Sequence, residues 1–282
     1  MNIPSDDHQL IGRIYDLGIV ELNFETYEEL SQYIDCRYVF HCGLSMRNLV
    51  RRVDSLNQAG DLMWVDPSNW DNGQQMIDRY EWLDIATDVF LTRLISVFDC
   101  VLIFANDVLE AGLEPLQCRI KNLKKRGAPI KLVEALEGLQ EDHEALRAER
   151  NARVHEGLER THSSCDQTFR IAELFERSGR NLTGKDSLGR RISSARYMKE
   201  GLVQLQRDHN ASMRKLRKRL EQVYDLLGAD FEDRFREKFR DPENGFGDGS
   251  KVAKIDRPFA PAIAPGPHHL TGGERPTEGG HP

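Results

Sequence analysis

The segment from Met76 to Glu110 places the tightest limit on the fold. Apolar residues repeat along it at alternating steps of four and three, in two series that are offset by one residue. One series is Phe90, Leu94, Val97, Val101, Phe104 and Val108, and the other is Leu91, Ile95, Phe98, Leu102, Ala105 and Leu109. This spacing is typical of a helix with a wide apolar stripe. We therefore expect a long helix that packs on more than one side. Arg93, Asp99 and Asn106 make it too polar to span a membrane, so no membrane partner is expected.

The same periodicity, with capping and breaking signals, predicts further helices. Their expected ranges are about 26–57, 116–126, 130–158, 165–177 and 191–227, the last with Phe239 as its outer limit. Thr26 and Glu29 fit a capping box at the start of the first of these. Gly60 and Pro67 mark a loop after it. Residues 1–24 are expected to be either irregular or extended.

No run of alternating β-branched residues and no internal repeat is present. The fold class is therefore predicted as all-α, a bundle of four to five long helices. The expected organisation is an N-terminal helical extension and loop over 1–75, the bundle over 76–240, and a Gly- and Pro-rich disordered tail over 241–282.

The net charge of the chain limits the kinds of partner that it can bind. The net charge of −7 excludes the whole molecule as a polyanion binder, so a nucleic-acid site would have to be a local basic patch. The best candidate for such a patch is a basic face of the predicted helix near the C-terminus. It carries Arg207, Arg214, Lys215, Arg217 and Lys218. The alternative is that these charges only keep an exposed helix face in contact with water. Five cysteines without a CxxC pair, and a start without signal-peptide features, predict reduced thiols and a cytoplasmic location.

The candidate chemistry lies in the segment Arg150-Asn151-Ala152-Arg153-Val154-His155. Metal-free RNA cleavage needs a group that moves protons and a cation that holds the scissile phosphate. His155 titrates near neutral pH and suits the first task, while the planar Arg150 fork suits the second. Asn151 lies one turn before His155 on the same helix face. Arg150 points about 140° away from His155 around the helix axis.

This segment resembles the Arg-x4-6-His motif of the HEPN superfamily, and the resemblance covers about residues 76–227. It implies an all-helical domain that acts as a metal-independent endoribonuclease without cofactors. Arg150 would hold the phosphate, His155 would be the acid or base, and Asn151 would position the substrate or ring. It also implies a homodimer, with the wide stripe of 76–110 as one interface, and a toxin–antitoxin or phage-defence role beside an antitoxin. Some relatives carry a nucleotidylated Tyr where this chain has Gly157, so that form of control is not expected.

A different class of function explains the same features. The motif string recurs at Arg275 to His281 among prolines and glycines, so it arises easily. Arg150 and His155 would then lie on a solvated helix face, with Glu149 and Glu156 as ion-pair partners. The chain would be a non-catalytic module that binds RNA or protein.

Two further residues are candidates for supporting roles. Asp99 lies in an apolar run and is expected to be buried, either within a polar stripe at a helix interface with Asn106 or as a group that orients Arg150 or His155 across the bundle. Arg153 would steer phosphate or be a plain surface charge. The candidate metal ligands Asp142, His143, Glu144 and His162 do not have the spacing of a known site, so no metal is expected.

Overall fold

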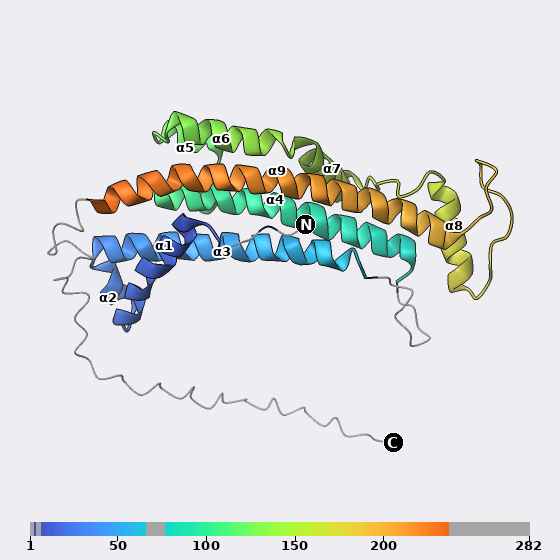
Figure 1. Cartoon of the computed structure of the whole chain (residues 1–282), viewed down its shortest axis with the longest axis horizontal. Coiled ribbons are helices and arrows are strands. Elements are labelled where there is room, and N and C mark those ends of the chain that lie inside the picture. Colours follow the sequence, from blue (N-terminus) through green and yellow to red (C-terminus); the bar gives the residue numbers. More distant parts are fainter. Residues whose placement is uncertain (1–2, 4–6, 66–76, 237–282) are drawn as a thin grey trace, which may run out of the picture.

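The computed structural model describes residue 3 and residues 7–65 and 77–236, and every regular element in this part is a helix. Three long helices lie side by side: α3 (Ile34–Leu62), α4 (Arg79–Val108) and α9 (Ser194–Arg236) (Figure 1). The predicted all-α bundle is thereby confirmed. The loop at Pro67, the start at Met76 and the tail over 241–282 lie outside the described residues. In the part that the structure describes, no helix is both long and apolar enough to cross a membrane.

Helix α4 is the centre of the bundle, as its double periodicity predicts. It begins with a capping box in which the Asp78 carboxylate accepts from the Glu81 amide and the Glu81 carboxylate accepts from the Asp78 amide. Both apolar series are buried: Phe90, Val97 and Phe104 of one, and Leu91 and Ala105 of the other, are all at most 1% exposed. Helix α3 packs on one flank of α4 and α9 on another. The stripe is therefore covered within the chain, and the expectation that it forms a dimer interface is wrong.

The N-terminal segment is helical, so the expectation of irregular or extended chain is wrong. Helix α1 (Gln9–Gly18) buries Leu10, Ile11, Ile14 and Leu17 against α3 and α9. The 3-10 helix η1 (Ile19–Asn23) follows it. Thr26 caps α2 (Tyr27–Ser31) by accepting from the Glu29 amide, which is one half of the predicted capping box, while the Glu29 carboxylate accepts from the Glu25 amide. Helix α2 ends before α3 begins, so the predicted helix over 26–57 is two helices.

Gly60 also departs from the prediction, because it lies inside α3 rather than in a loop. A Cβ atom there would stand 2.5 Å from Cε1 of the buried His209 ring of α9. The glycine lets α3 and α9 approach closely at this point. A close approach to a distant residue leaves no mark in the local sequence.

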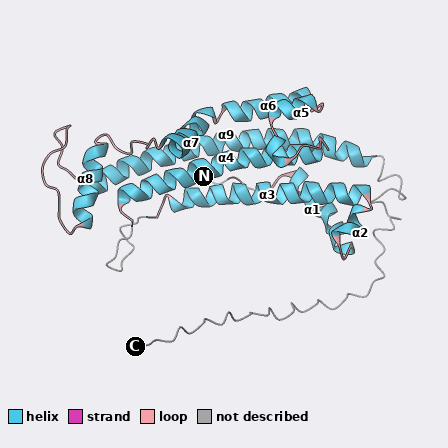
Figure 2. Cartoon of the chain, turned by 180° about the vertical axis from the view of Figure 1, so that it is seen from behind, coloured by secondary structure: helices cyan, strands magenta, loops and turns pink. Residues whose placement is uncertain are grey.

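The predicted helix over 130–158 is interrupted at Asp142 and His143, giving α6 (Ile130–Glu141) and α7 (Glu144–Glu156). His143 is buried and its Nδ1 lies 3.0 Å from the Leu139 carbonyl oxygen, while Asp142 accepts from Arg219 of α9 at 2.7 Å. The Asp142–Arg219 contact joins the end of α6 to α9, whereas α7 packs on α4. Figure 2 shows α5 (Ile120–Lys125) and α6 on the outside of the bundle beside α9. The 3-10 helix η3 (Pro115–Gln117) precedes α5, so the predicted helix over 116–126 is shorter than expected.

Helix α8 (Asp166–Arg177) lies across one end of the bundle (Figure 1). The loop between α8 and α9 is organised by the buried Asp186 carboxylate, which accepts from the Tyr197 hydroxyl at 3.0 Å and from the Arg190 backbone amide at 2.8 Å. Burial raises the pKa of Asp186, but the hydrogen bonds from Arg190, Tyr197 and Leu188 outweigh it and lower the pKa to about 2.

Candidate functional site

The motif residues Arg150, Asn151 and His155 lie on the short helix α7. It ends at Gly157, whose φ of 67° is left-handed and suits glycine. Glycine at this position therefore ends the helix.

Arg150 and Asn151 are brought together on α7. The half-buried Arg150 donates from Nη1 to Oδ1 of Asn151 at 2.9 Å. Within the described residues Arg150 makes no salt bridge. Glu149, the expected ion-pair partner, instead pairs with Arg160 at 2.8 Å, so that part of the alternative explanation is wrong.

His155 stands apart from Arg150. Its ring is exposed, and no described residue hydrogen-bonds to it. Arg153 contacts Asp84 and Asp88 of α4, and His155 points about 160° away from it around the α7 axis. A cavity of about 630 Å³ between α4, α6 and α7 is lined by Arg147, Asp99 and Phe98, among others, but by none of the three motif residues. One chain therefore does not gather Arg150, Asn151 and His155 around a single groove.

Asp99 is 58% exposed, so the expectation of a buried carboxylate is wrong. Its Oδ1 lies 3.9 Å from Arg147 Nη2, and the Arg147 guanidinium covers the neighbouring Phe98 ring at 4.8 Å from its centroid. The position at the edge of the apolar stripe explains the exposure. Asn106 is buried, and it binds the loop after α4 by accepting from the Leu113 amide at 2.9 Å.

Arg153 belongs to the best-formed polar cluster near the motif. Its side chain is only 8% exposed, which excludes a plain surface charge. Nε donates to Asp88 at 2.6 Å, and Nη2 lies 3.3 Å from Asp84. Asp84 also binds the ring of His162, which is 2% exposed, at 2.8 Å from Nε2. Burial alone raises the pKa of Asp84, but hydrogen bonds from His162 and Arg153 lower it below its usual value.

A third carboxylate extends this cluster to α8. Asp166 accepts from the His162 backbone amide at 2.7 Å and from the Tyr80 hydroxyl at 2.8 Å. The Tyr80 and His162 rings meet edge to face, with centroids 5.2 Å apart. The cluster joins α4, α7 and the segment before α8. Because the Arg153 guanidinium and the His162 ring are buried, we assign it a role in stabilising the fold. No group of three or more His, Cys, Asp or Glu side chains among the described residues could hold a metal ion.

Asp84 and Asp88 were not expected as partners of the motif helix. They lie four residues apart on α4 and therefore share one helix face. This spacing was the one sequence feature that indicated a shared cationic partner. Their partner Arg153 is 65 residues from Asp88, and periodicity does not reveal that pairing.

The predicted basic face of α9 is exposed along its length: Arg207, Arg214, Lys215, Arg217 and Lys218 are all open to solvent. Two of these charges are neutralised, because Arg217 binds Glu221 at 2.9 Å and Lys215 lies 3.9 Å from Asp142. Arg207, Arg214 and Lys218 make no ion pair with any described residue. Their spacing of seven and four residues aligns them along one side of the helix. We call these three residues the α9 stripe.

No protein-family model, no curated protein and no solved structure matches the chain.

Proposed function

We propose that this protein is a helical module that binds RNA through the α9 stripe. The observation that carries the proposal is the set of three exposed cations without carboxylate partners on an otherwise acidic chain. Eleven residues of helix separate Arg207 from Lys218, or about 16 Å at 1.5 Å per residue, which spans several nucleotides. Cations that meet phosphates in this way release counterions and give a salt-dependent affinity.

Fluorescence anisotropy with labelled single-stranded RNA tests this proposal. Three neutralised phosphates predict a slope of about −2 for log affinity against log salt concentration, at about −0.7 per contact. The triple variant Arg207→Gln, Arg214→Gln and Lys218→Gln should lose most of the affinity and of the slope. A matched control is Lys121→Gln, Lys124→Gln and Lys125→Gln, which removes three exposed charges from α5. Equal losses in both triple variants would contradict the proposal and leave protein binding as the remaining module function.

A second candidate is metal-independent cleavage of RNA of the HEPN type, with Arg150 holding the phosphate, Asn151 positioning the substrate or ring and His155 as acid or base. It is favoured by one observation: neither Arg150 nor His155 is paired with a carboxylate of the described residues, although carboxylates abound in the chain. Since the two side chains point in different directions, the site would combine Arg150 of one copy with His155 of another. A cytoplasmic homodimer in a toxin–antitoxin or phage-defence system is the setting that the motif suggests.

Cleavage is tested by incubating labelled single-stranded RNA in EDTA with the wild type, Arg150→Ala and His155→Ala. Products with 2',3'-cyclic phosphate ends from the wild type alone support the enzyme. Glu156→Ala, which truncates the exposed neighbour of His155, is the control that should retain activity. If the site is shared between copies, mixing the two inactive variants should restore about a quarter of the wild-type activity, because half of the dimers are mixed and each has one intact site. Equal cleavage by wild type and His155→Ala would exclude this candidate.

A further inference from the structure

A cavity of about 450 Å³ lies between α3 and α4, away from both α7 and α9. Its lining consists of Ser45, Asn48, Arg51, Arg52, Cys100 and Ile103. The lining thus combines two arginines and an amide with the apolar Ile103 and the Cys100 thiol, and it contains no carboxylate. Its volume lies within the range of small-ligand sites, about 300–1,000 Å³.

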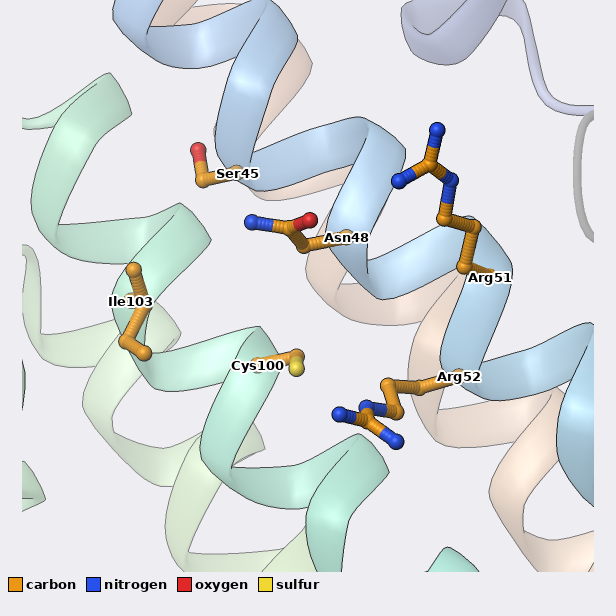
Figure 3. Close-up of a pocket in the computed structure, with 6 residues that line it drawn as sticks. All are labelled: Ser45, Asn48, Arg51, Arg52, Cys100 and Ile103. Carbon is orange, nitrogen blue, oxygen red and sulfur yellow. The ribbon is translucent and has the colours of Figure 1, made fainter. Parts of the chain in front are cut away.

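The polar groups of this cavity differ in what they can offer a ligand. Figure 3 shows Asn48 and Arg52 extending from α3 toward α4, while Arg51 turns the other way. Arg51, Arg52 and Asn48 are exposed, and neither arginine is paired with a carboxylate of the described residues. The Ser45 hydroxyl donates to the His41 carbonyl oxygen at 3.1 Å, so it forms part of the wall.

Cys100 adds no negative charge to the cavity. Burial raises the pKa of its thiol, and the nearby Arg52 only partly opposes this effect. The thiol therefore stays protonated at neutral pH and leaves the Arg52 charge uncancelled. A neutral thiol is also a poor nucleophile, so the cavity lacks the chemistry for covalent catalysis.

We propose that the α3–α4 cavity binds a phosphate group, either free or carried by a small molecule. Arg52 would donate two parallel hydrogen bonds to the phosphate oxygens, and Asn48 would add one from its amide. Arg51, the residue before Arg52, points away from the cavity and would add only to the positive potential around its mouth (Figure 3). Ile103 and the Cys100 thiol would contact the apolar part of the ligand. No α9 residue lines the cavity, so this site is separate from the RNA surface proposed above.

Equilibrium dialysis against labelled orthophosphate and against AMP at low ionic strength tests the site. The wild type should show one saturable site per chain, and Arg52→Gln should weaken binding by about tenfold or more, as expected for loss of a charge-assisted bond. Asn48→Ala is a second variant with unchanged charge and should also weaken binding. Arg37→Gln makes the same charge change on the same helix, at an exposed residue outside the lining, and should bind like the wild type. Circular-dichroism melting checks that each variant is folded.

The two probes identify the source of the phosphate. Similar affinities for orthophosphate and AMP would assign the site to free phosphate, whereas tighter AMP binding would assign it to a nucleotide. The triple variant of the α9 stripe should retain binding, which makes the result independent of the RNA proposal. The proposal is overturned if the wild type binds neither probe saturably, or if Arg52→Gln and Arg37→Gln bind with equal affinity.

Discussion

Replacing Asp84 with Ala should destabilise the protein far more than replacing Asp88, although both carboxylates bind Arg153. Asp84 is 21% exposed and joins two buried groups, the Arg153 guanidinium and the His162 ring, whereas Asp88 is 58% exposed and has one partner there. Removing one partner of a buried pair costs about 3–5 kcal/mol, because the remaining charge is left without compensation. Asp88 still binds Arg153 in the variant, so we expect the lower end, about 3 kcal/mol. An exposed pair contributes about 1 kcal/mol or less, which is the expectation for Asp88→Ala.

Urea denaturation at pH 7, followed by far-ultraviolet circular dichroism, measures both free energies of unfolding. The folded pKa of Asp84 is lower than its unfolded pKa, so its contribution is fully present above the unfolded value and is lost as the pH falls through the folded one. At pH 7 the whole effect should therefore be visible. If Asp84→Ala costs no more than Asp88→Ala, the argument that burial sets the strength of this cluster is refuted.

Three further outcomes follow from single residues. The folded pKa of Asp186 is about 2, so its hydrogen bonds stabilise the fold above the unfolded pKa near 4, and this stabilisation is lost as the pH falls toward 2. Asp186→Asn should therefore make the free energy of unfolding depend less on pH over this window. An unchanged pH dependence would contradict this prediction. Gly201→Ala should destabilise by about 1–3 kcal/mol in urea, since its Cβ would meet the His162 carbonyl oxygen at 2.8 Å. Gly12→Ala, whose Cβ would meet nothing within 4 Å, should stabilise by about 0.5–1 kcal/mol, and the same sign for both glycine variants would show that packing is not the cause.

The helical character of the chain could be predicted because it depends on neighbours within four residues. The double periodicity of α4 and the Thr26 cap can be read locally, because residues three and four apart share a helix face and the cap binds within its own turn. The end of α7 at Glu156 was predicted two residues too late. The interruption at Asp142 and His143 was missed for the opposite reason. Its cause includes Arg219, 77 residues farther along the chain, which binds Asp142.

In the candidate site, too, the local features could be predicted and the long-range contacts could not. Spacing places Asn151 and His155 on one face of a helix, and it aligns Arg207, Arg214 and Lys218 along one side of α9. The partners of these residues depend on the packing of distant helices. Asp99 is exposed although it lies among apolar residues, and Arg153 is buried although it lies in a charged run, because Asp84 and Asp88 of α4 meet α7 at that point. Helix formation follows from local backbone and side-chain geometry, whereas the burial and pairing of a charge depend on whichever surface a neighbouring helix brings to it.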